Sequence, residues 1–155
     1  MRIEAFLRQS PIVQTSRVAR RMEASLNLML TGEEVTAFEA LVLAALFFES
    51  GTIKPSALAA SFETTRSNVS HCISSLEGKG LVQRKIDPRD ARAVQLVLRP
   101  QGKKQAARVV GIMDQMQRQL EAGIGTAKLE GMMRQMTEVE ELCSHVAKAA
   151  NVARR

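Results

Sequence analysis

Cationic and hydrogen-bond-donating side chains are concentrated in one segment of this 155-residue chain. Residues 66–104 hold nine basic and three acidic side chains, whereas the other 116 residues hold 13 of each sign, so the net charge of +6 arises in this segment. A positive field confined to one segment favours a polyanionic partner. On charge alone, a solvated basic face remains the alternative.

The first part of this segment, RSNVSHCISSL at 66–76, has an apolar and a polar face at helical spacing. Val69, Cys72, Ile73 and Leu76 form the apolar stripe that would hold the helix. The polar face carries no acidic residue that would repel phosphates, so its donors can contact base edges or phosphates. For His71, plain surface solvation is the alternative. The candidate DNA-contacting residues of this helix, with its capping residue, are Thr65, Arg66, Ser67, Asn68, Ser70, His71 and Ser74.

A charged hairpin is expected directly after this helix. Two apolar stretches, Leu81–Ile86 and Ala93–Leu98, flank six residues that include Asp-Pro, two arginines and a second aspartate. Gly80 suits the left-handed position that follows a helix end. Arginines of such a hairpin can enter a narrow minor groove, where the negative potential is strong, or can pair with aspartates and stiffen the turn. The candidate DNA-contacting residues of the hairpin are Arg84, Arg89 and Arg92.

Other chemistries find little support in the residue types. The two histidines, His71 and His145, lie far apart in sequence, and Cys143-x-His145 has no convincing companion ligands. We find no nucleophile with a base, no phosphate-cradling loop and no metal quartet, so neither an enzyme nor a cofactor is predicted. Cys72 is predicted to be a core thiol rather than a redox sensor, because a sensor needs an accessible thiolate.

The chain is expected to be a cytoplasmic protein. No stretch approaches the roughly 18 apolar residues of a membrane helix, and Glu4 interrupts the short apolar N-terminus that a secretory signal would need. Cys72 and Cys143 are then expected to be reduced thiols.

Most of the remaining sequence predicts helices. Ser10 before Pro11 is a good helix start, and Thr36 with Glu39 forms the T-x-x-E pattern of a capping box. The helix after Thr36 is apolar nearly all round and should be central. The expected helices span about 10–30, 36–51, 55–62, 66–79, 100–122 and 126–150, with Ile53 as a possible single strand residue.

A short helix, a tight turn, a second helix and a hairpin together form a winged helix-turn-helix. The predicted fold class is therefore mainly α with a small β-hairpin wing, flanked by N- and C-terminal dimerisation helices. We expect residues 34–104 to form the DNA-binding domain, and residues 1–33 and 105–155 to form a helical dimerisation region.

The central segment closely resembles the MarR (multiple-antibiotic-resistance regulator) family. The matching residues are Leu58-Ala59, Arg66–Ser70, Leu76-Glu77, Gly80–Val82, Arg84, Asp87–Arg92, Leu96, Leu98 and Pro100–Gly102. The resemblance implies a triangular homodimer that binds double-stranded DNA and regulates transcription, often as a repressor released by small molecules. The competing class is a winged-helix protein-interaction module that has lost DNA binding.

Three residues depart from the family pattern. Glu63 stands where the helix-turn-helix turn usually has Gly, which predicts a slightly different turn. Lys54 replaces a usual Thr or Ser cap, and Arg99 replaces the usual Thr before Pro100. Each lost cap should cost about 1 kcal/mol at most.

Methionines cluster in the first helix and in the last two helices. A dimer core is the simplest interpretation, but Met adapts to varied shapes, so part of this surface could line a cavity for a small aromatic or phenolic ligand. Phe38, Phe47 and Phe48 could contribute to such a cavity. The methionines concerned are Met22, Met29, Met113, Met116, Met132, Met133 and Met136.

Overall fold

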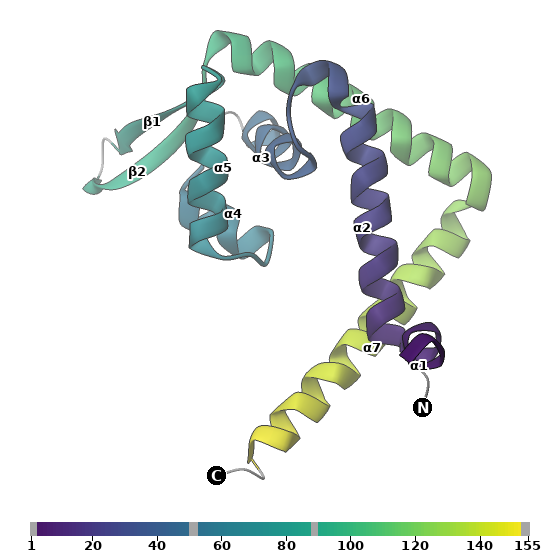
Figure 1. The fold of residues 1–155 in the computed structure, drawn as a ribbon. Helices are drawn as coiled ribbons and strands as arrows, with labels where there is room; N and C mark the ends of the chain where they lie inside the picture. The colour runs from purple at the N-terminus through teal and green to yellow at the C-terminus, as the bar shows by residue number, and fades with distance from the viewer. Residues whose placement is uncertain (1–2, 50–52, 88–89, 153–155) are drawn as a thin grey trace. The chain divides into compact units, whose positions relative to one another are not determined.

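The computed structural model describes residues 3–49, 53–87 and 90–152, with the side chains of residues 87 and 90–93 left aside. The chain is mainly helical with a two-stranded antiparallel hairpin, which confirms the predicted fold class (Figure 1). Its elements are α1 (Ile3–Gln9), α2 (Pro11–Met29), the 3-10 turn η1 (Thr31–Glu33), α3 (Ala37–Phe48), α4 (Pro55–Ser61), α5 (Arg66–Gly78), β1 (Val82–Asp87), β2 (Asp90–Leu98), α6 (Pro100–Ile124) and α7 (Thr126–Val152).

The chain forms two units, Met1–Met113 and Asp114–Arg155. The hydrophobic core lies in the first unit, where α3 contributes the fully buried Val42, Leu43 and Leu46. Side chains from α4, α5, both strands and the start of α6 complete it, among them Leu58, Val69, Ile73, Leu76, Val82, Leu96 and Val109. The near-uniform apolarity of α3 predicted this central place.

Local capping explains where several helices begin. The Ser10 hydroxyl accepts a hydrogen bond from the Val13 N–H at the start of α2. At α3, the Glu39 N–H donates to Thr36 and the Thr36 N–H donates to the Glu39 carboxylate, which confirms the predicted capping box. Lys54, by contrast, makes no side-chain cap at α4, as its substitution for Thr or Ser predicts.

The element boundaries differ from the expected ones in a few places. A short helix, α1, precedes α2 and was not predicted; Ser10 closes it by donating its N–H to the Phe6 carbonyl before it caps α2. Helix α3 ends at Phe48, ahead of Gly51, and β2 already begins at Asp90. No helix in the described parts of the chain is long and apolar enough to cross a membrane.

The hairpin is anchored to the core at its base. Val82 pairs with Leu98 and Arg84 pairs with Leu96, and the register shifts between Ile86 and Asp87. Ile53 adds the predicted single bridge, because its carbonyl accepts the Leu96 N–H at 2.8 Å. In Figure 1 the hairpin extends from the end of α5 away from α3.

Two glycines shape the junctions on either side of the hairpin. Gly80 has φ of 72°, the left-handed conformation that its position after α5 predicts. Gly102 lies against the chain that enters the hairpin, and a Cβ there would be 1.9 Å from the Leu81 carbonyl oxygen. The same carbonyl accepts the Arg99 N–H at 2.9 Å, so the start of α6 is held against the end of α5.

Candidate nucleic-acid interface

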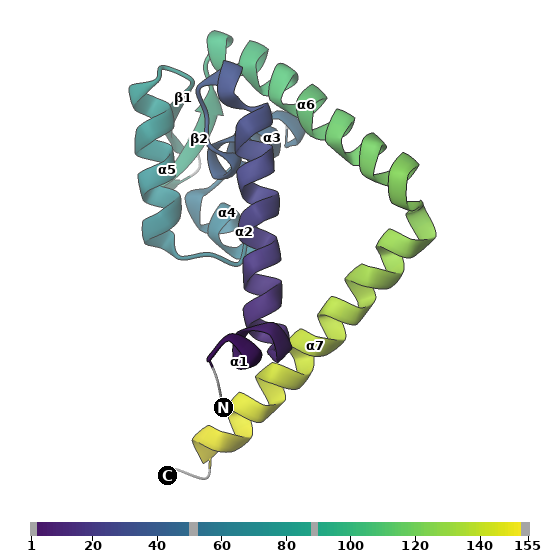
Figure 2. The ribbon, with the colours of Figure 1, turned by 45° about the vertical axis from the view of Figure 1, so that its right-hand side comes forward.

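Helices α4 and α5 are joined by a tight left-handed turn, seen from a second side in Figure 2. Glu63 has φ of 48°, a conformation that favours glycine, and its N–H donates to the Ala60 carbonyl. Glu63 therefore holds a left-handed conformation with a side chain present, which costs local strain of about 1–2 kcal/mol. The expected difference in turn geometry from the family stays a prediction.

The first turn of α5 is capped by the residues just before it. The Thr65 hydroxyl accepts the Asn68 N–H at 3.1 Å, as predicted for this cap. The Asn68 side-chain amide donates to the Thr64 hydroxyl at 3.0 Å. These bonds are local, so they order the exposed end of α5 without attaching it to another helix.

Helix α5 separates its two faces as the spacing predicts. Val69, Cys72, Ile73 and Leu76 are buried in the core. The structure brings the predicted polar residues together on the exposed face of α5. This helix has no acidic residue between Arg66 and Leu76. These exposed residues are Arg66, Ser67, Asn68, Ser70, His71 and Ser74, preceded by Thr65.

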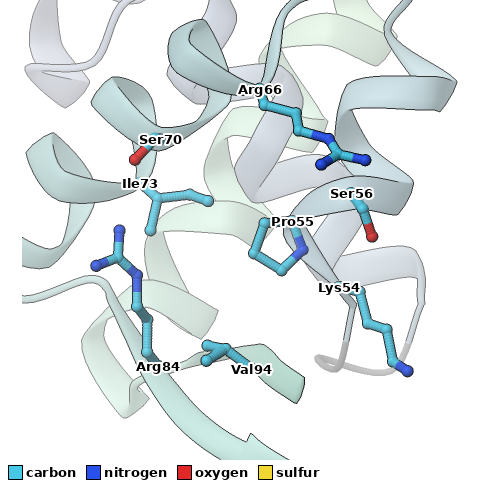
Figure 3. Close-up of a pocket in the computed structure, with 8 residues that line it drawn as sticks. All are labelled: Lys54, Pro55, Ser56, Arg66, Ser70, Ile73, Arg84 and Val94. Atoms are coloured by element: carbon cyan, nitrogen blue, oxygen red, sulfur yellow. The ribbon is translucent and has the colours of Figure 1, made fainter. Parts of the chain in front are cut away.

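A basic hollow of about 640 Å³ opens between α4, α5 and the hairpin (Figure 3). Arg66 and Ser70 of α5 line one side, and Arg84 of β1 lines another. Lys54 and Ser56, from the start of α4, also line it. These two were not among the predicted site residues, because they precede α5 in the sequence and only the fold brings them beside it.

Arg84 is held at the rim of this hollow by Glu77. The Arg84 guanidinium lies 3.5 Å from the Glu77 carboxylate, which also accepts the Arg84 N–H at 3.2 Å. Because the Arg84 side chain is 42% exposed, this ion pair contributes about 1 kcal/mol or less. A phosphate can therefore compete for the guanidinium at little cost.

Two of the predicted arginines belong to the tip of the hairpin. Arg89 lies outside the described residues, and Arg92 is described only as backbone within β2. Their predicted role in the minor groove stays a prediction.

Cys72 lies below this surface. Burial raises the pKa of the Cys72 thiol to about 12, and the negative charge of Glu39 adds to the rise. The thiol is 7% exposed and stays protonated, which confirms its prediction as a core residue. Among the described residues, no group of His, Cys, Asp or Glu side chains could hold a metal ion.

Comparison with solved structures places this geometry in a known fold. The chain is similar to Staphylococcus aureus MepR in complex with DNA, with a TM-score of 0.74 at 21% identity over 84% of this chain and 95% of that one. A mutant Escherichia coli MarR with operator DNA has a TM-score of 0.74 at 19% identity, covering 86% and 96%. The organohalide-sensing regulator RdhR-CbdbA1625 with bound 2,4-dichlorophenol has 0.74 at 18%, covering 91% and 81%.

Sequence comparison addresses the family directly. No curated protein matches the chain. Residues 36–94, however, match the sequence model of the MarR family. This match runs from the capping box of α3 through α4 and α5 into the second strand of the hairpin. Residues 36–94 of the chain are therefore similar to the MarR family, and the fold is that of the winged helix-turn-helix structures compared above.

Proposed function

We propose that this protein binds an inverted-repeat operator in double-stranded DNA as a homodimer and represses transcription there. The observation that carries the proposal is the continuity of two surfaces. Arg66 and Ser70 belong both to the acid-free exposed face of α5 and to the lining of the basic hollow. One side of the unit thus offers donors for base edges and cations for phosphates, which DNA recognition requires together.

The two surfaces suit different parts of the duplex. The exposed residues of α5, from Thr65 to Ser74, would enter the major groove, where each base pair shows a distinct pattern of donors and acceptors. Arg66 and Arg84 would contact phosphates at the rim of the hollow. Arg89 and Arg92 would reach the flanking minor groove from the hairpin. Binding to chromosomal DNA would place the protein in the cytoplasm.

The dimer is proposed from an apolar surface on α7. No described side chain of this helix is buried, whereas soluble proteins rarely leave a long apolar stripe in water. Leu142 is 64% exposed and Val146 is 62% exposed. The stripe consists of Met132, Met133, Met136, Val139, Leu142 and Val146. A second copy of this chain is the proposed partner, with residues 1–33 and 105–155 as the dimerisation region.

Sedimentation tests the dimer. Wild type should be dimeric at micromolar concentration, and Leu142→Glu should shift it toward monomer because a charge would be buried in the interface. Ala127→Glu adds the same charge on the opposite, exposed side of α7 and should leave the dimer intact. A wild-type monomer would refute the proposal.

A binding titration tests the DNA function and separates it from the protein-interaction alternative. Random duplex and an inverted repeat with half-sites roughly 34 Å apart are titrated at about 50 mM and about 200 mM salt. Affinity should fall at least tenfold at the higher salt, because phosphate neutralisation releases counterions. The inverted repeat selected from a random pool should bind more tightly than random duplex. Weak DNA binding whose affinity does not change with salt concentration would favour a protein-interaction module.

We also propose that a small aromatic or phenolic ligand releases the DNA. The similar fold of the organohalide-sensing regulator RdhR-CbdbA1625, solved with bound 2,4-dichlorophenol, supports this proposal. Of the candidate aromatics, Phe38 packs against Phe62 with ring centroids 5.8 Å apart, whereas Phe47 and Phe48 are exposed. Titrating 2,4-dichlorophenol into the protein–DNA complex tests the proposal. If the phenol binds a specific site, the fraction of DNA released should rise with its concentration and then reach a plateau; no release would contradict the proposal for this phenol.

A further inference from the structure

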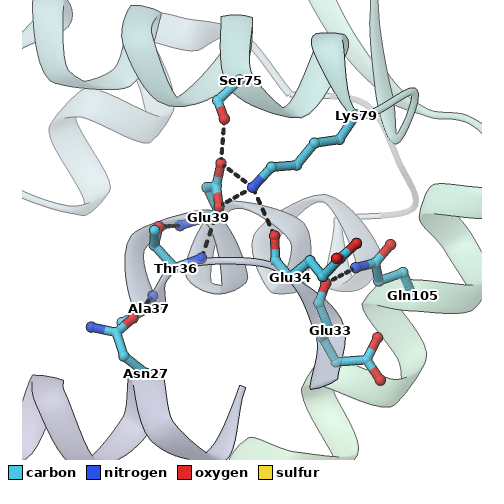
Figure 4. Close-up of polar contacts among 9 residues, drawn as sticks. All are labelled: Asn27, Glu33, Glu34, Thr36, Ala37, Glu39, Ser75, Lys79 and Gln105. Atoms are coloured by element: carbon cyan, nitrogen blue, oxygen red, sulfur yellow. Dashed lines mark hydrogen bonds and ion pairs between the residues drawn. The ribbon is translucent and has the colours of Figure 1, made fainter. Parts of the chain in front are cut away.

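A buried carboxylate joins the start of α3 to α5 (Figure 4). Glu39 is 4% exposed. Its Oε1 accepts the Ser75 hydroxyl at 2.6 Å, and the Lys79 Nζ donates to Oε1 at 2.9 Å and to Oε2 at 2.7 Å. Oε2 also accepts the Thr36 N–H at 2.8 Å. Both side-chain partners of Glu39 thus come from α5.

Lys79 ends α5 and fixes the point from which the hairpin departs. It is the C-cap residue, and Gly80 turns the chain immediately after it. Its Nζ also donates to the Glu34 carbonyl at 2.8 Å, so one ammonium holds both α3 and the segment before it. Ser75 is attached to Glu39 one helical turn earlier. Two points along the same face of α5 are therefore fixed to one carboxylate.

The opposite half of α5 has attachments of another kind. Its polar bonds at Asn68 go to the neighbouring Thr64 and Thr65, and its tertiary contacts are those of the apolar stripe. Apolar packing is non-directional and accepts small shifts or rotations of a helix. A hydrogen-bonded ion pair has far fewer acceptable geometries. Small rotations about the fixed C-terminal end would displace the DNA-reading end.

We propose that Glu39 and Lys79 are positioning residues for DNA recognition, which set the orientation of the exposed face of α5 without touching DNA. The inference rests on the proposed DNA-binding function. Ion pairs inside proteins often add little to stability, yet in some proteins they select one arrangement of the core. In this pair Glu39 is buried and Lys79 is partly exposed. In this protein, the arrangement selected is the one that presents Ser67, Asn68 and His71 to the major groove.

The decisive variant removes both charges at once. Glu39→Met with Lys79→Met leaves the net charge unchanged and places two adaptable apolar side chains where the ion pair was. Its matched control is Glu33→Met with Arg108→Met. That pair is also joined by several hydrogen bonds, among them Arg108 Nε to Glu33 Oε1 at 2.9 Å and Arg108 Nη2 to Glu33 Oε2 at 2.8 Å, but it joins η1 to α6.

Each protein is measured for unfolding, for dimer content, and for affinity to the selected inverted repeat and to random duplex. The Glu39/Lys79 double variant should keep its dimer and most of its stability, because it removes the buried Glu39 charge together with that of its partner, whose side chain is 35% exposed. Compared with wild type, the ratio of its operator affinity to its random-duplex affinity should fall at least tenfold. Its affinity for random duplex should stay within about twofold of the wild-type value. The control pair should leave the ratio unchanged.

The outcomes separate this inference from the function on which it rests. A folded double variant that discriminates as well as wild type overturns the positioning role and leaves DNA binding intact. A wild type that binds no DNA overturns the proposed function and this inference with it. If the double variant does not fold, Ser75→Ala is the deciding variant for the positioning role, because it removes only one hydrogen bond to Glu39. It should lower the ratio about threefold, and an unchanged ratio would overturn the inference.

Discussion

Glu63 and Gly80 adopt the same left-handed backbone conformation on either side of α5, with φ of 48° and 72°. Gly80 does so without a steric penalty, because it has no Cβ. Glu63 has a Cβ, so its backbone is strained in the turn that leads to the Thr65 cap. Helix α5 is therefore preceded by a strained residue and followed by an unstrained one.

Relief of this strain is the first prediction. Glu63→Gly should raise the free energy of unfolding by about 1 kcal/mol, the reverse of placing a side chain at a left-handed position. Glu63→Gln is the matched control, since it removes the same charge and keeps the Cβ. Urea denaturation of both variants checks the effect, and equal stabilities would show that charge rather than backbone strain matters at this turn.

The exposed face of α5 should determine which sequence is preferred. Asn68→Ala or His71→Ala should change the preferred half-site, with about 1–3 kcal/mol lost at each contacted base pair. For Asn68 part of the loss can arise from its bond to Thr64. His71 makes a cleaner test because it lies one turn beyond that cap. Selection from a random pool reads the preference directly, and an unaltered consensus in both variants would exclude these residues from base readout.

The hairpin should contribute affinity with little sequence preference. Arg92→Ala should weaken binding to all half-site variants by similar factors, because the minor groove presents a degenerate pattern and attracts arginine through its potential. The dimer and the fold should be spared. Arg118→Ala, which removes an equal charge in α6, is the control and should bind as wild type does. An Arg92→Ala protein with wild-type affinity would remove the hairpin from the proposed interface.

Acid should weaken the fold through Glu39. Burial by itself raises the pKa of the Glu39 carboxyl, but hydrogen bonds from Lys79, Ser75 and the Thr36 N–H, with the charge of Lys79, outweigh it and hold the pKa below its ordinary value of 4.5. A lowered folded-state pKa stabilises the fold above the ordinary value, and this stability is lost as the pH falls through the folded value.

Denaturation from about pH 6 down to about pH 3 measures this loss. Wild type should lose more unfolding free energy over this range than Glu39→Gln, which cannot titrate at this position. The variant should be less stable than wild type at about pH 6, because Lys79 loses its buried partner. Parallel pH curves for the two proteins would assign the acid sensitivity to other carboxylates.

The two cysteines should differ sharply in reactivity. With the pKa of Cys72 raised to about 12 by burial, the native protein should resist alkylation there at about pH 8, since the thiolate is the reactive form. Cys143 is exposed in the single chain but lies on the α7 stripe proposed for the dimer, so its alkylation should become faster as dilution favours the monomer. Mass spectrometry of iodoacetamide-treated native and urea-unfolded protein distinguishes them. Rapid labelling of Cys72 in the native state would revive the redox-sensor hypothesis.

Much of this architecture follows from local sequence. The caps at Ser10, Thr36 and Thr65, and the left-handed turn at Gly80, depend on short-range backbone chemistry, so each can be read from a few adjacent residues. The buried stripe of α5 follows from helical periodicity in the same way. The charge of the basic segment can likewise be counted without a fold, and it is the basis for predicting a polyanionic partner.

Tertiary structure decided what distant residues do together. Lys54 joined Arg66 and Arg84 around one hollow because the fold brings α4, α5 and β1 together. The sequence identified Glu39 only as a capping residue, yet packing of α3 against α5 buries its carboxylate beside Ser75 and Lys79. Such pairings depend on how helices pack across long sequence separations, and a directional bond between buried groups exists only once that packing has removed the water.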